Sequence, residues 1–171
     1  MMKVVVVVAQ EKFNNTEFSA VVSNLKKNDI PFEVASTSRS GASGYGSFSI
    51  VPDLCIQDLI VSDYDCLIIV GGSGCKRYLW NNAVLHEKIR IAHENNKLLA
   101  AICLAPICFI YSKIMDGSFI TAHKTKETLR IIEESGNIYR ESDVYISGNI
   151  ITGNGPKASQ KFCEAILSLL T

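Results

Sequence analysis

The sequence has 171 residues, of which 47% are hydrophobic and 20% are charged, and its 17 acidic side chains balance its 17 basic ones. We expect one domain over residues 1–171, because folding a chain of this length removes roughly 70% of the unfolded surface from water. The balanced charge offers no attraction to polyanions, so neither nucleic acid nor an anionic membrane is expected as a partner.

The N-terminal run MMKVVVVVAQEK is too short to span a membrane and has no small-residue cleavage pattern after it. It predicts a buried strand and a cytoplasmic location. In a reducing compartment cysteines are expected as free thiols, here Cys55, Cys66, Cys75, Cys103, Cys108 and Cys163. With no CxxC pair and with the three histidines far apart, we expect neither a metal site nor another cofactor.

Short apolar runs predict a series of strands at residues 4–9, 32–35, 66–70, 98–103, 119–122, 144–146 and 150–152. Helical periodicity fills several of the gaps. One predicted helix, residues 16–28, places on one face Phe18, Val21, Val22 and Leu25. A later one does the same with Val84, Leu85, Ile89 and Ala92.

Two prolines mark further helices. Pro106 lies in the first turn of a short apolar helix that runs to Ile110, and Gly155-Pro156 begins a last helix. The apolar stripe of this last helix comprises Ala158, Phe162, Ile166 and Leu169. The Ser- and Gly-rich residues 36–49 have no such period and are expected as a surface excursion. Uninterrupted apolar strands alternating with helices predict a flavodoxin-like three-layer α/β/α sandwich with a mostly parallel sheet.

In such open sheets, ligands bind beyond the carboxyl ends of the strands. Three predicted strand ends carry unusual residues: Asn14 to Glu17 follow the first, Gly71 to Gly74 the third, and Cys103 the fourth. We expect all three at one edge of the sheet.

Cys103 stands where a strand gives way to a helix within one or two residues, which resembles a nucleophile elbow. The N-terminus of a helix favours the reactive thiolate form of such a cysteine. By contrast, Cys66, Cys108 and Cys163 lie on apolar stripes and are expected as buried core residues. Cys75 is interpreted as a surface cysteine, with a resolving thiol as the alternative.

Three other positions have both a structural and a functional interpretation. Glu17 lies in the first turn of its helix, where the helix dipole alone explains a carboxylate. It also shares a face with Val21, which would desolvate the carboxyl and suit it to acid–base chemistry.

Gly71-Gly72 is either a plain turn or a point of close approach to a ligand, without any phosphate-binding pattern. His123 ends a strand and is either solvated or part of the site.

Together these residues resemble the DJ-1/PfpI family of the class I glutamine-amidotransferase-like superfamily, which includes protein deglycases and intracellular peptidases. The resemblance spans nearly the whole chain and is carried by VVVVVAQEKFNNTEF, LIIVGGSG, AAICLAP, ITAHKTKE and ITGNGPKAS. It implies that Cys103 is the nucleophile, Glu17 its protonated acidic partner and His123 the nearby histidine. It further implies an oxyanion site at the backbone amides of Gly72 and Leu104, and a homodimer.

The sequence departs from the family pattern in three places. Leu104 stands where peptidase-like members have His, Val70 replaces the Pro that often precedes Gly-Gly, and residues 36–49 match no subgroup. The first departure weakens a peptidase interpretation.

Three functions follow from this set of residues. The leading one is cofactor-free glyoxalase or deglycase chemistry on small dicarbonyls, or on glycated thiols and amines, with Cys103 as the nucleophile. A redox sensor or chaperone that oxidises at Cys103 without turnover is the second. A cysteine peptidase or amidase with His123 as base is the third.

Overall fold

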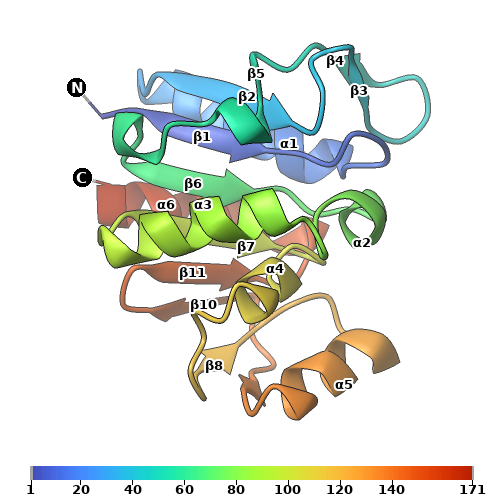
Figure 1. Cartoon of the computed structure of the whole chain (residues 1–171), viewed down its shortest axis with the longest axis vertical. Coiled ribbons are helices and arrows are strands. Elements are labelled where there is room, and N and C mark those ends of the chain that lie inside the picture. Colours follow the sequence, from blue (N-terminus) through green and yellow to red (C-terminus); the bar gives the residue numbers. More distant parts are fainter. Residues whose placement is uncertain (1, 171) are drawn as a thin grey trace.

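The computed structural model describes residues 2–170, and at its centre this part of the chain forms a seven-stranded sheet (Figure 1). The order across the sheet is β10-β11-β7-β6-β1-β2-β5. Only the hairpin of β10 with β11 is antiparallel among these described pairs. The strands are β1 (Val4–Val7), β2 (Phe32–Ser36), β5 (Leu54–Cys55), β6 (Cys66–Ile69), β7 (Leu98–Ile102), β10 (Val144–Ser147) and β11 (Ile150–Gly153).

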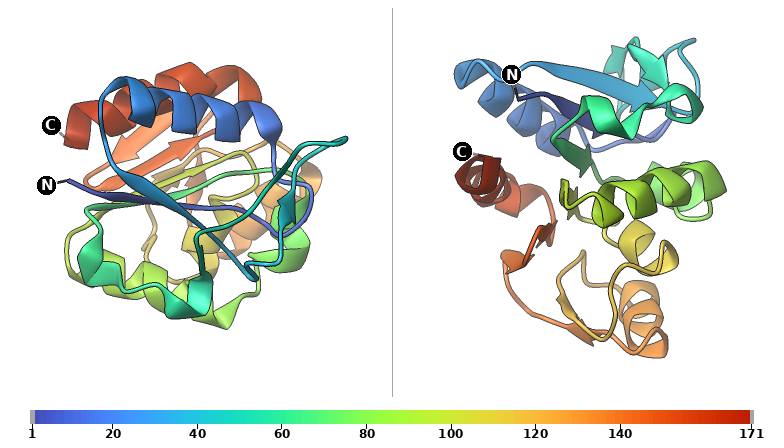
Figure 2. Two further views of the ribbon diagram at one scale, coloured as in Figure 1. Left: turned by 90° about the horizontal axis from the view of Figure 1, so that it is seen from above. Right: turned by 60° about the vertical axis from the view of Figure 1, so that its left-hand side comes forward.

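Helices cover both faces of the sheet, as Figure 2 shows from above. One face carries α1 (Asn15–Lys27) and α6 (Ser159–Leu170), and the other carries α3 (Ala83–Glu94) and α4 (Ile107–Tyr111). Further elements are α2 (Gly74–Tyr78), α5 (Lys126–Glu134) and the short 3-10 helices Ile56–Asp58, Val61–Asp63 and Pro156–Ala158. Two small strand pairs lie outside the main sheet, β3 (Ala42–Ser43) with β4 (Ser49–Ile50) and β8 (Phe119–Ile120) with β9 (Ile138–Tyr139). The predicted flavodoxin-like sandwich is confirmed.

The sheet core explains why the apolar runs lack polar interruption. All four residues of β1, Val4–Val7, are fully buried, with alternate side chains in the two apolar clusters on opposite faces. A strand buried on both faces needs apolar residues at every position rather than at alternate ones. The same holds for Cys66–Ile69 and Leu98–Ile102, so the three central strands form a rigid base for the loops that follow them.

The structure corrects several details of the sequence prediction. Helical periodicity predicts buried positions for Val84 and Leu169, but they are 41% and 46% exposed, because each lies on the edge of an otherwise buried helical stripe. The last helix begins at Ser159, after a separate 3-10 turn opened by Pro156. Cys75 is fully buried rather than on the surface, since α2 packs it against the core. No helix within residues 2–170 is long and apolar enough to cross a membrane.

Adjacent residues of α3 provide a matched test of this core. Leu85 is fully buried, whereas Val84 is 41% exposed. Leu85→Ala should lower the free energy of unfolding by about 2–5 kcal/mol, because it leaves a cavity, and Val84→Ala should lower it by about 0.5 kcal/mol or less. Urea unfolding followed by circular dichroism measures both, and equal losses would contradict the assigned helix orientation.

Candidate functional site

Three loops meet at the carboxyl edge of the sheet, the end to which the strand arrows point in Figure 1. They follow β1, β6 and β7, which are adjacent and parallel. They carry Asn14 and Glu17, then Gly71 to Gly74, then Cys103. The expected meeting of these strand ends at one edge is confirmed.

Cys103 occupies the turn between β7 and α4 with a φ of 67°. This left-handed backbone conformation is costly for a residue other than Gly, and here the surrounding chain holds it in place. The Cys103 amide donates to the carbonyl of Gly153 at 2.9 Å, and its own carbonyl accepts from the amide of His123 at 2.7 Å. The residue as a whole is only 6% exposed, so Cys103 stands nearly buried at a strained elbow.

The Gly71–Gly72 loop passes so close to Cys103 that only glycine fits. A Cβ on Gly71 would lie 2.4 Å from the Cβ of Cys103 and 2.6 Å from Oε2 of Glu17. Gly72 has a φ of 116°, and its Cβ would lie 2.4 Å from the carbonyl oxygen of Lys12. Backbone amides of this loop can therefore reach the sulfur.

Glu17 is fully buried in the first turn of α1, which Asn14 caps by accepting from the Glu17 amide at 3.1 Å. Its Oε2 accepts from the Gly71 amide at 2.7 Å, while Oε1 is buried without a hydrogen-bond partner. Helix-dipole compensation alone does not call for such burial. The carboxyl instead points under the glycine loop toward Cys103.

Burial raises the pKa of Glu17 to about 7, although the Gly71 amide and the Cys103 thiol both lower it by hydrogen bonding. Burial likewise raises the pKa of Cys103 to about 12, and the negative charge of ionised Glu17 contributes to the rise. Because the two groups repel when both are ionised, near neutral pH the pair holds at most one negative charge. Protonation of Glu17 removes that repulsion from the sulfur.

Two backbone amides lower the pKa of Cys103 and so oppose the effect of burial. Hydrogen bonds from Gly72 and Leu104 lower the pKa of Cys103 and lie where negative charge on sulfur or on a bound oxygen would develop. The Leu104 carbonyl is held by the indole of Trp80 at 2.8 Å. The sequence suggested that the dipole of the following helix stabilises the Cys103 thiolate. Because α4 has only five residues, we attribute this stabilisation to the two amides instead.

His123 is joined to the site through its backbone. Its amide holds the Cys103 carbonyl, whereas its side chain is exposed and its Nδ1 lies 3.8 Å from where a Cβ of Gly155 would be. The structure thus brings Glu17, Cys103, Gly72 and Leu104 together and leaves the imidazole at the surface. Among residues 2–170, no group of three or more His, Cys, Asp or Glu side chains is placed to hold a metal ion.

The residues that support the site were harder to predict from the sequence. Asn14 caps α1, and its amide also donates to the Gly71 carbonyl at 2.8 Å. Its signal was present, because Asn is a preferred helix cap and Glu17 lies three residues later. Trp80 gave no such signal, since nothing local relates it to Leu104.

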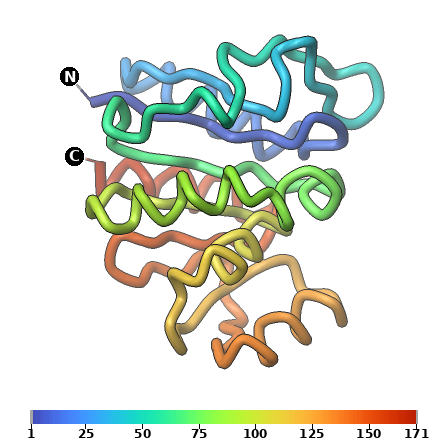
Figure 3. Tube along the Cα trace, in the orientation of Figure 1, coloured from blue at the N-terminus to red at the C-terminus, as the bar shows by residue number. Residues whose placement is uncertain are grey.

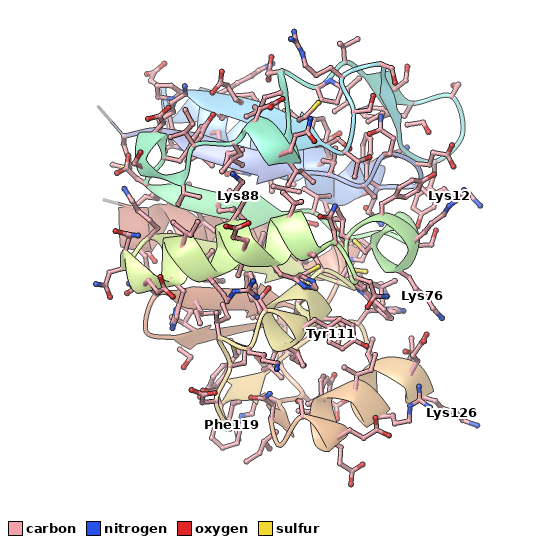
Figure 4. The ribbon with its side chains drawn as sticks, viewed as in Figure 1. Lys12, Lys76, Lys88, Tyr111, Phe119 and Lys126 are labelled. Atoms are coloured by element: carbon pink, nitrogen blue, oxygen red, sulfur yellow. The ribbon has the colours of Figure 1, made fainter. Side chains whose placement is uncertain are left out.

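The helix after the glycine loop and the helix after His123 are linked by an ion pair. Lys76 of α2 lies 2.8 Å from Glu127 of α5, and both side chains are well exposed. Figure 4 shows Lys76 at the same end of the molecule as Lys12 and Lys126. Basic side chains therefore border this end.

The fold and the site define a flavodoxin-like α/β protein with a cysteine at a nucleophile elbow and a buried glutamate beside it. The chain belongs to the DJ-1/PfpI family, whose family model matches residues 2–169.

Relatives with different names are similar to this chain in sequence. An uncharacterized protein of Methanocaldococcus jannaschii is 30% identical over 98% of this chain and 82% of its own length. The glutathione-independent glyoxalase DJR-1.2 of Caenorhabditis elegans is 31% identical over 71% of this chain and 63% of its own. YraA of Bacillus subtilis, whose name carries an unproven cysteine protease assignment, is 26% identical over 99% of both chains.

A solved structure supports the fold. The crystal structure of a ThiJ/PfpI domain protein from Brachyspira murdochii matches with a TM-score of 0.92, covering 98% of this chain and 95% of that one at 23% identity.

Replacing Glu17 should change the reactivity of Cys103 with pH. In Glu17→Gln the carboxylate charge that raises the pKa of Cys103 is gone, so iodoacetamide should alkylate Cys103 at lower pH than in the wild type. Peptide mass spectrometry after timed labelling gives the profile. Cys55, which is partly exposed, provides the internal control and should keep its profile. An unmoved Cys103 profile would show that the two groups do not interact.

The same substitution should change the pH dependence of stability. The pKa of Glu17 is near 7 when folded and near 4.5 otherwise, so ionisation favours unfolding and wild-type stability falls as pH rises through this window. Relative to wild type, Glu17→Gln should gain up to about 3 kcal/mol between pH 4 and pH 8. Urea unfolding of both proteins at each pH measures the difference, and a constant difference would contradict a buried carboxyl.

Proposed function

We propose that this protein performs cofactor-free glyoxalase or deglycase chemistry on small dicarbonyls, or on the adducts they form with thiols and amines. The observation that carries the proposal is the placement of the Cys103 sulfur between the Gly72 and Leu104 amides and the proton-holding Glu17. The glyoxalase name of one relative supports it. We propose that the protein acts as a cytoplasmic homodimer.

The reaction begins when ionised Glu17 takes the proton of the Cys103 thiol and the sulfur attacks the aldehyde carbon of a 2-oxoaldehyde such as methylglyoxal. The carbon–sulfur bond forms, the aldehyde oxygen takes up a proton, and a hemithioacetal results. In this role the Gly72 and Leu104 amides stabilise the negative charge that develops on oxygen.

Proton transfer completes the reaction without an external oxidant. Glu17 as carboxylate removes the proton from the former aldehyde carbon and returns it to the neighbouring carbonyl carbon, while the hydroxyl proton passes to the neighbouring oxygen, which leaves a thioester of a 2-hydroxy acid. Water then cleaves the carbon–sulfur bond, so the sum is dicarbonyl plus water to hydroxy acid. A pKa of Glu17 of about 7 suits a group that must both accept and donate a proton near neutral pH. His123, exposed beside the elbow, is assigned a share in these proton transfers.

A peptidase function is less well supported. An acyl-transfer reaction needs a base oriented beside the nucleophile, and Leu104 follows Cys103 in this chain. The His123 ring is exposed, and its described link to Cys103 is through the backbone. Cysteine-dependent release of amine from peptide or amide substrates would favour this alternative.

Turnover of methylglyoxal to lactate tests the proposal. Cys103→Ala should abolish activity, and Glu17→Gln should lower kcat by about 10²–10⁴-fold, the usual contribution of a general base. His123→Ala should have a smaller effect because its ring is exposed. Cys55→Ala is the control, being a thiol away from the site that should leave kcat unchanged.

Lack of Cys103-dependent turnover in the wild type would reject the enzymatic proposal. In that case, intact-mass measurement after mild peroxide identifies the sensor alternative by a gain of two oxygens at Cys103 that Glu17→Ala loses.

A further inference from the structure

The Ser- and Gly-rich segment of residues 36–49 folds back against the site. It forms the β3–β4 hairpin and runs beside the loop after β1, as the tube in Figure 3 shows. Ser43 donates to the Gln10 carbonyl at 3.0 Å, and Phe13 is bridged to Gly44. The ring of Phe48 lies 5.9 Å from that of Phe13, edge to face. This anchored hairpin is more than a surface excursion.

Tyr45, at the tip of the hairpin, is fixed through its backbone to the helix that carries Glu17. Its amide donates to Oδ1 of Asn15 at 2.8 Å, and Nδ2 of Asn15 donates back to the Tyr45 carbonyl at 3.0 Å. A Cβ on the preceding Gly44 would lie 1.9 Å from Oδ1 of Asn15, so the approach requires glycine. Two hydrogen bonds between the same two residues set both the position and the rotation of Tyr45.

The hydroxyl of Tyr45 reaches the glycine loop. It accepts from the Ser73 amide at 2.8 Å and donates to Oγ of Ser73 at 3.2 Å. The Ser73 amide belongs to the peptide group directly after Gly72. On the other side of the same peptide, the Gly72 carbonyl accepts from the Cys75 amide at 3.2 Å. The peptide between Gly72 and Ser73 is thereby held at both its polar atoms.

The preceding peptide, between Gly71 and Gly72, also has a partner at each polar atom. The Gly71 carbonyl accepts from Asn14, and the Gly72 amide donates to the Cys103 sulfur. Since glycine has the largest backbone freedom to lose, two consecutive glycines hold an amide in place only when neighbouring groups restrain them. The Tyr45 hydroxyl supplies one of these restraints, at the Ser73 amide.

We propose that Tyr45 is a positioning residue, which fixes the Gly72–Ser73 peptide and so keeps the Gly72 amide directed at the Cys103 sulfur and at the oxygen of a bound substrate. Tyr45 acts through the loop and not on the reacting atoms. Its effect on turnover rests on the proposed function, whereas its effect on the thiol does not.

Tyr45→Phe tests this directly, since it removes the hydroxyl and keeps the ring. Alkylation of Cys103 should shift to higher pH, because a loosened Gly72 amide stabilises the thiolate less. Hydrogen exchange at the Ser73 amide should become faster. With methylglyoxal, kcat should fall about tenfold with KM nearly unchanged, a smaller effect than outright loss of an oxyanion donor.

Ser73→Ala is the matched control. It removes the contact between the Tyr45 hydroxyl and Oγ of Ser73 but keeps the hydrogen bond from the Ser73 amide to that hydroxyl. The alkylation of Cys103 with pH should therefore stay as in the wild type. An equal shift in both variants would overturn the assignment to the amide. A wild-type alkylation profile and exchange rate in Tyr45→Phe would overturn the proposal altogether. A shifted profile in a protein without any dicarbonyl turnover would reject the proposed function and support the positioning role.

Discussion

The site depends on the absence of a side chain at Gly71. Three segments far apart in the sequence meet there, and the space that a Cβ would occupy is already taken by Cys103 and Glu17. This contact lets a backbone amide reach a buried carboxylate, and it brings the following amide to the sulfur. The strands β1, β6 and β7 make it possible, because their parallel alignment ends them together at one edge.

Burial of an acid next to a thiol is unfavourable for folding, yet it gives the pair its chemistry. A carboxyl that titrates near neutral pH exchanges protons readily, whereas an exposed glutamate would stay ionised. The stable apolar sheet beneath the site offsets the cost. Such a division between a stabilising core and a destabilised site is common where side chains have shifted pKa values.

The position of the elbow and six of the seven strands of the main sheet were predictable from apolar runs. The seventh strand, β5, was missed because its two residues, Leu54–Cys55, form no such run, and the strand predicted at residues 119–122 lies outside the main sheet as β8. Glu17 was recognisable as inward-facing from its spacing to Val21. Burial at the edges of helical stripes was not predictable, as Val84 and Leu169 show, because it depends on which element packs beside the helix. The role of residues 36–49 was invisible for a related reason: Tyr45, Asn15 and Ser73 are brought together by tertiary contacts, without any local periodicity.

The ion pair between Lys76 and Glu127 is a contact near the site that depends on salt concentration. It links α2, which follows the glycine loop, to α5, which follows His123, and both of its side chains are well exposed to water. Exposed ion pairs contribute little and are screened by dissolved salt. The contact between these two helices is therefore weak and weakens further as ionic strength rises, whereas the apolar packing around Glu17 and Cys103 does not rest on such a pair.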